Sequence, residues 1–184
     1  MIEGIIAGAF TRHMVAHMTL VALVAPLLAI VIARSRFNPV ARRPRWFSPI
    51  AASLIEFVVI WAWHAPALHV AARHDDGMFA LEQASFLGAS TYLWLAIIGG
   101  DHSSSAMRAG TGIVALVITF AHMTMLGAVL ALTPRDLYGH GAAALADQQL
   151  GGAVMIASST VAYLGAALWL SRSLLVAQPF GGRS

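Results

Sequence analysis

The chain has 184 residues, of which 59% are hydrophobic and only 10% are charged, far below the roughly 25% charged residues of a typical soluble domain. This composition predicts an integral membrane protein and argues against a soluble globular domain. The absence of Cys excludes disulfide bonds, thiolate metal sites and a cysteine redox pair. Arg supplies every positive charge behind the net charge of +3, but no basic helix or strip predicts nucleic-acid binding.

Five apolar runs come close to the length of roughly 20 residues that a helix needs to cross a bilayer. They lie at about residues 13–33, 50–69, 79–98, 110–132 and 148–170. The sequence therefore predicts an all-α integral membrane protein, a bundle of five transmembrane helices that forms a single membrane domain over residues 1–184. Residues 171–184 are expected to form a short cytoplasmic tail.

The first run opens with two histidines and two methionines at helical spacing. His13 and His17 are four residues apart, as are Met14 and Met18, so each pair forms a stripe and the two stripes are neighbours on a helix. Imidazole binds borderline and soft metals, whereas thioether selects soft ones, and the chain has no thiolate to compete. This combination favours copper over other metals.

The second and third runs add polar groups at the ends that should face the first histidines. The second run closes on Trp-His-Ala-Pro at residues 63–66, and Pro66 is expected to bend the helix beside His64 and His69. The third run begins with Glu82 and Gln83 in its first turns. Ionisable side chains inside a membrane segment are costly, which favours a functional role for His64 and Glu82.

The fourth run carries one histidine, and the fifth begins with polar side chains. His122 lies at mid-depth in the fourth run, and Asp147 and Gln148 open the fifth, before Gly151 and Gly152. The same cost of ionisable groups leads us to predict that His122 shares a site with the histidines of the other runs. The two glycines are expected to let helices approach closely.

The Arg residues predict how the helices are oriented. The segment between the first two runs carries five Arg, whereas the loops expected on the opposite face carry Arg73 and Arg135, each beside acidic residues. The positive-inside rule then places that segment in the cytoplasm, the N-terminus outside and the C-terminus in the cytoplasm. In this orientation the polar ends of all five helices fall in the outer leaflet.

Other polar residues have simpler interpretations. Four histidines are expected to lie at the membrane interface or to contact backbone carbonyls: His69, His74, His102 and His140. Glu56 is expected to hydrogen-bond to a neighbouring helix and is assigned no functional role. Met123 and Met125 point to different faces of one helix, so they are interpreted as core residues.

The order of these motifs resembles the CtaG-like family of cytochrome c oxidase assembly proteins, first known for caa-type oxidases. The resemblance covers about residues 13–155 and rests on five motifs: His-Met-x-x-His-Met-x-Leu, Trp-His-x-Pro-x-Leu, Leu-Glu-x-x-Ser-Phe-Leu, His-Met-Thr-x-Leu-Gly and Asp-Gln-Gln-Leu-Gly-Gly-x-x-Met. It implies a non-catalytic, multi-pass protein of the bacterial inner membrane that binds copper on the periplasmic side and delivers it to the oxidase. The implied partners are cytochrome c oxidase subunits, periplasmic copper chaperones and the lipid bilayer.

The family motifs assign roles to particular residues of this chain. Copper is expected to be bound by imidazoles with a deeper fourth histidine and thioether donors: His13, His17, His64, His122, Met14 and Met18. Glu82, Asp147 and Gln148 are expected to orient these ligands through hydrogen bonds. The chain departs from the family pattern at Phe79 and Gln83, where histidines are expected, and these departures remove one or two ligands.

Two other functions remain open on the sequence. His64 and His122 on neighbouring helices would also suit a haem, because paired histidines are common axial ligands. A metal-free scaffold for oxidase assembly would use the polar cluster only to hold the helices together. A transporter is disfavoured because the sequence shows no inverted repeat and the inner halves of the helices lack a polar path.

Overall fold

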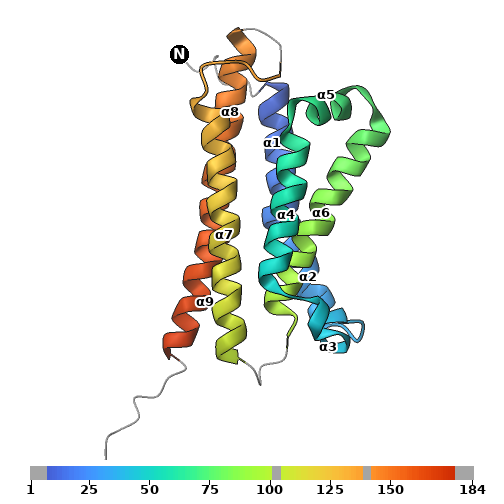
Figure 1. Cartoon of the computed structure of the whole chain (residues 1–184), viewed down its shortest axis with the longest axis vertical. Coiled ribbons are helices and arrows are strands. Elements are labelled where there is room, and N and C mark those ends of the chain that lie inside the picture. Colours follow the sequence, from blue (N-terminus) through green and yellow to red (C-terminus); the bar gives the residue numbers. More distant parts are fainter. Residues whose placement is uncertain (1–7, 101–104, 139–141, 177–184) are drawn as a thin grey trace, which may run out of the picture.

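The computed structural model describes residues 8–100, 105–138 and 142–176, and within them every regular element is a helix (Figure 1). The predicted all-α class is therefore confirmed. Three of the helices are long and apolar enough to cross a membrane, namely Ala9–Arg34, Met107–Leu132 and Ala143–Arg172. A fourth candidate is the pair Pro49–His64 and Pro66–His74, which is bent by 70°.

The predicted span at residues 79–98 corresponds to α6 (Asp76–Ile98), which does not count among the apolar candidates. With 23 residues it is long enough, but Glu82, Gln83 and several hydroxyl side chains lower its hydropathy. The structure therefore supports three or four apolar spans. The count of five and the orientation of the termini stay predictions, and residues 177–184 of the expected tail lie outside the described residues.

The first span is continuous but changes its helical pitch. It consists of α1 (Ala9–Thr19), a π-helical turn η1 (Leu20–Val24) and α2 (Ala25–Arg34). Pro26 in the first turn of α2 has no amide proton to give to the turn before it. The wider π-helical turn precedes that proline, a common way for a helix to absorb such a defect.

A short connection leads from this span to the bent pair. It contains α3 (Pro39–Arg42) and a 3-10 turn η2 (Pro44–Trp46), at the end of the bundle opposite to α5 (Figure 1). Helix α4 (Pro49–His64) then runs the length of the bundle, and α5 (Pro66–His74) lies across its end. Since α5 marks one end of the molecule, we call that end the α5 end.

The second half of the chain forms a helical hairpin. Helix α7 (Ser105–Leu132) is followed by α8 (Ala142–Ser159), a π-helical turn η4 (Thr160–Leu164) and α9 (Gly165–Val176). The backbones of α7 and α8 touch, because a Cβ built on Gly152 would lie 2.6 Å from the carbonyl oxygen of Gly127. Helix α8 also packs on α1, and α4 packs on both α6 and α7. The expected close approach at Gly152 is therefore confirmed.

The core contains a hydrogen-bonded polar cluster midway along α4. Glu56 Oε1 accepts hydrogen bonds from Ser90 Oγ in α6 and from Tyr163 Oη in η4, the latter at 3.2 Å. Ser53 and Thr119 share a hydrogen bond of 2.9 Å between α4 and α7. All five side chains are fully buried. The interpretation of Glu56 as a hydrogen-bonding residue between helices is thus confirmed.

Candidate metal centre

The histidine stripe of α1 faces two groups of polar side chains. At the α5 end, His13 Nε2 lies 3.3 Å from Glu82 Oε1 in α6, and the His13 ring centroid lies 5.4 Å from that of His69 in α5. His13, His69 and Glu82 are all buried, and each offers a ligand atom within 4.8 Å of the others. These three side chains have the composition of a metal site with two imidazoles and one carboxylate.

One turn further along α1, His17 meets His64, the last residue of α4. Their ring centroids are 5.4 Å apart, and Phe86 covers His17 at a ring distance of 4.0 Å. His64 Nδ1 lies 2.7 Å from the carbonyl oxygen of Ile60. A carbonyl only accepts, so Nδ1 carries a proton, and in a neutral ring Nε2 keeps its lone pair for a metal.

Three nitrogens of this histidine pair have no hydrogen-bond partner although they are buried. They are His64 Nε2 and both ring nitrogens of His17. Buried polar atoms without partners are rare and costly, and such groups call for a ligand or another specific explanation. The pair therefore has the chemistry of a metal site, with buried imidazole nitrogens that lack hydrogen-bond partners.

The bend after α4 explains why two histidines of one segment reach the same stripe of α1. His64 and His69 are five residues apart and would point about 140° apart around a straight helix. Pro66 ends α4, and α5 turns away by 70°, so that His64 faces His17 while His69 faces His13. The predicted break at Pro66 is confirmed, and it builds both halves of the cluster.

The structure brings together four of the residues expected at the site, His13, His17, His64 and Glu82, and adds His69. From the sequence, His69 is expected at the membrane interface or against a backbone carbonyl. The signal for its role was its position five residues after His64 across a proline. Of the other histidines interpreted in this way, His74 lines a cavity described below, and His102 and His140 lie outside the described residues.

His122 lies apart from this cluster. Its ring contacts Phe57 of α4 at a centroid distance of 5.3 Å, seven residues before His64 and so about 10 Å away along the helix axis. Both nitrogens of His122 are buried without hydrogen-bond partners. His64 meets His17 and not His122, so His122 as the deeper ligand, or as the haem partner of His64, stays a prediction.

The methionines of α1 point towards α8. A Cβ built on Gly151 would lie 3.0 Å from Met14 Cγ, so Met14 packs against this glycine. Met18 lines a groove formed with α8 and η4. The two stripes of α1 are neighbours, as expected, but they serve different partners: the imidazoles face α4, α5 and α6, whereas the thioethers face α8.

The residues that open the fifth motif build the scaffold around α1. Asp147 accepts hydrogen bonds from the backbone amides of Phe10 at 2.8 Å and Thr11 at 3.1 Å, and from the Thr11 hydroxyl. The first amides of a helix have no partner within the helix, so Asp147 caps α1 from a different helix. Its contacts are with the backbone that carries His13, and not with the imidazole.

Gln148 also has a structural role. Its side-chain oxygen accepts from the Leu137 amide at 2.9 Å, and its amide group donates to the carbonyl oxygens of Leu130 at 3.2 Å and Arg135 at 3.4 Å. Gln148 thus holds the end of α7 and the following loop against α8. The hydrogen bonds of Asp147 and Gln148 to backbone groups give both residues a scaffold role, and their orientation of metal-binding imidazoles stays a prediction.

Loss of the cap is expected to destabilise the fold modestly. In Asp147→Ala the Phe10 and Thr11 amides lose their acceptor, which should lower the free energy of unfolding by about 1–2 kcal/mol. Asp147→Asn keeps an acceptor oxygen and should lose less. Thermal unfolding of both variants in detergent, followed by circular dichroism, measures the difference. Equal stability of Asp147→Ala and the wild type would contradict the capping role.

The two positions that depart from the family pattern flank Glu82. The Gln83 side-chain amide donates to Glu82 Oε2 at 3.0 Å, and the Phe79 ring centroid lies 6.4 Å from that of His13. Histidines at these positions would therefore stand beside the His13, His69 and Glu82 group. In this chain the second carboxylate oxygen is instead paired with a neutral amide.

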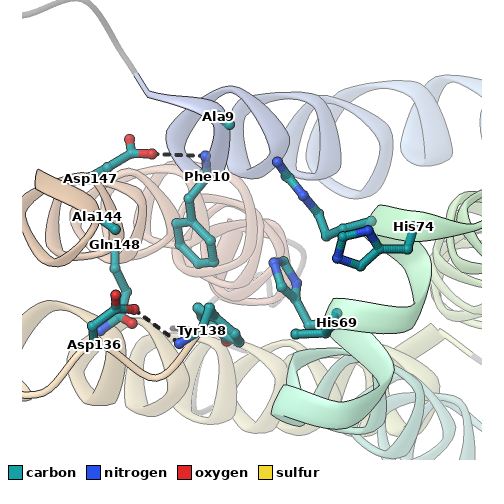
Figure 2. Close-up of a pocket in the computed structure, with 11 residues that line it drawn as sticks. Ala9, Phe10, His69, His74, Asp136, Tyr138, Ala144, Asp147 and Gln148 are labelled. Carbon is teal, nitrogen blue, oxygen red and sulfur yellow. Dashed lines mark hydrogen bonds between the residues drawn. The ribbon is translucent and has the colours of Figure 1, made fainter. Parts of the chain in front are cut away.

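A cavity of about 280 Å³ lies at the α5 end beside this group (Figure 2). It is lined by residues from α1, α5, the loop after α7 and α8, among them Phe10, His69, His74 and Tyr138. Burial raises the pKa of the Tyr138 phenol, which stays protonated and donates to the carbonyl oxygen of His64 at 3.1 Å. This bond ties the cavity wall to the corner between α4 and α5.

Comparisons with known proteins agree with the motif order. Residues 2–176 match the family described as cytochrome c oxidase caa3 assembly factor. Neither a curated protein nor a solved structure matches the chain. The match takes in all five motifs and both halves of the histidine cluster. The chain therefore belongs to the caa3 cytochrome c oxidase assembly factor family.

Proposed function

We propose that this assembly factor binds copper between His13, His17 and His64 and passes it to the oxidase. The observation that carries the proposal is the buried His17 and His64 pair, which has three ring nitrogens without a hydrogen-bond partner. Copper is the cargo here, and the chain performs binding and transfer without catalysis. The family assignment supplies the destination, a cytochrome c oxidase of the bacterial inner membrane.

The donor set suits copper that has to be released again. Imidazole is a good ligand for copper, and the chain has no thiolate that would hold the ion more firmly. His64 is preset as an Nε2 ligand by its bond to the Ile60 carbonyl. Glu82 beside His13 supplies a negative charge close to the bound cation. The proposed site leaves out Met14, Met18 and His122, whose observed contacts are with α8 and with Phe57.

The predicted orientation places the α5 end on the outer side of the membrane, facing the periplasm. There copper would arrive from soluble chaperones and leave towards oxidase subunits. Within the described residues, His69 of α5 belongs both to the imidazole cluster and to the lining of the neighbouring cavity, so both lie at this end. This shared location supports exchange with partners on one side of the membrane.

The test is elemental analysis of detergent-purified protein after incubation with copper under reducing conditions. We expect close to one copper per chain in the wild type and a loss of most of it in His17→Ala and in His64→Ala. His122→Ala is the matched control, because it removes a buried imidazole away from the cluster and should keep its copper. A wild type without copper would leave a metal-free scaffold as the function, and a Soret band would favour haem.

A further inference from the structure

One imidazole separates the cavity at the α5 end from the buried ligands. His69 lines the cavity and also belongs to the group that it forms with His13 and Glu82. Among the described residues, neither His13 nor Glu82 lines the cavity. His69 is thus the one residue that the cavity wall and the metal-ligand group share.

Aromatic side chains hold His69 in the cavity wall. The Tyr138 ring centroid lies 4.3 Å from that of His69, and Phe10 lies 5.5 Å from it. Phe10 and Tyr138 stack on each other at 5.1 Å, and Figure 2 shows the three rings gathered around the cavity. This wall leaves His69 only 4% exposed, so an ion that moves inward from the cavity would meet its imidazole.

The four imidazoles form a series that leads inward from the cavity. His69 contacts His13 at 5.4 Å, and His17 contacts His64 at the same centroid distance. His13 and His17 lie one turn apart on α1, with about 5–6 Å between their Cβ atoms. Each imidazole is therefore close enough to the next for a bound ion to pass from one to the other by ligand exchange.

We propose that the cavity is the entrance for copper and that His69 is its loading residue. The ion would first be bound by His69, His13 and Glu82, and would then move to His17 and His64 while His13 stays bound. No change in the oxidation state of copper is needed, since one set of ligands replaces another. This inference rests on the proposed copper-binding function and adds a route to it.

The location of His69 suits a transient ligand. It lies in α5, a helix of only nine residues that a bend joins to α4 and that Asp75 separates from α6. A helix of this length is marginal alone and depends on its packing. The final ligands His17 and His64, by contrast, lie in α1 and α4, whose contacts extend along the bundle.

A loading residue should govern the rate of copper uptake and leave the final amount unchanged. The experiment mixes detergent-purified protein with copper and excess ascorbate, removes free metal on a fast desalting column at set times, and measures bound copper. We expect His69→Ala to take up copper about tenfold more slowly than the wild type and to reach the same final stoichiometry. His17→Ala should bind much less copper than the wild type even after long incubation.

His74→Ala is the matched control, because His74 lies in the same helix and lines the same cavity outside the ligand group. Its uptake rate should stay within about twofold of the wild type. His69→Gln, which keeps a polar side chain of similar reach, should repeat the slow uptake if His69→Ala folds poorly.

Three outcomes would overturn the loading role. An uptake rate in both His69 variants equal to or above the wild-type rate would show that copper does not pass through this imidazole. A lost final stoichiometry in both folded variants would make His69 a permanent ligand. A wild type that binds no copper would overturn the proposed function and the route together, whereas the first two outcomes leave copper binding intact.

Discussion

Glu82→Gln is expected to weaken copper binding by about ten- to a hundredfold without disturbing the fold. The carboxylate lies 3.3 Å from His13 Nε2 and is almost fully buried. In a low-dielectric site, a negative charge beside a bound cation contributes far more than it would in water. Glutamine keeps the size and an acceptor oxygen, but it removes this charge.

The measurement is a competition titration of copper against a chromogenic chelator under reducing conditions. Glu56→Gln is the matched control, since among the described residues it replaces a second fully buried carboxyl group, one that hydrogen-bonds Ser90 and not an imidazole. We expect the control to keep wild-type affinity for copper. Equal affinities of Glu82→Gln and the wild type would show that Glu82 neither balances nor orients the ligands.

The helices and half of the site could be predicted because they depend on local properties of the sequence. Apolar runs of sufficient length predicted the helices, of which three or four are apolar enough to cross a membrane, and the spacing of four residues between His13 and His17 predicted their common stripe. Pro66 predicted a break at the end of α4. None of these inferences needed to know how one helix lies against another.

The other half of the candidate site depends on the angles between helices, which cannot be read from local properties of the sequence. His69 reaches His13 only because α5 turns by 70°, and a proline permits such a bend without setting its size. His122 was expected in the cluster because ionisable membrane residues tend to be functional. The rotation of α7 places it against Phe57 instead.

Asp147 and Gln148 show a second reason why the prediction was incomplete. Their polar side chains beside a motif with histidines suggested contacts with imidazoles. The first turn of α1 and the loop after α7 both leave backbone groups without partners, and these two side chains satisfy them. Backbone groups without a partner in their own helix or loop thus account for the hydrogen bonds of both side chains. Which groups lack a partner is known only once the helices and loops are in place.

Glu56→Leu is expected to lower the free energy of unfolding by about 2–5 kcal/mol, the largest loss of stability among the substitutions considered. The carboxyl group joins α4 to α6 through Ser90 and to η4 through Tyr163. Leucine removes the acceptor that the two buried hydroxyl groups share. A buried polar group that loses its partner costs about 1–3 kcal/mol.

A conservative series separates this effect from loss of packing. Glu56→Gln keeps an acceptor oxygen and should lose only about 1 kcal/mol, while Ser53→Ala removes the bond to Thr119 and should lose a similar amount. Unfolding in mixed micelles, followed by circular dichroism, gives the free energy of unfolding of each variant and so ranks their stabilities. If Glu56→Leu were as stable as Glu56→Gln, the hydrogen bonds would contribute nothing net. If the order holds while folded Glu56→Gln keeps its copper, the buried carboxyl groups Glu56 and Glu82 serve different purposes, stability at mid-bundle and metal binding at the α5 end.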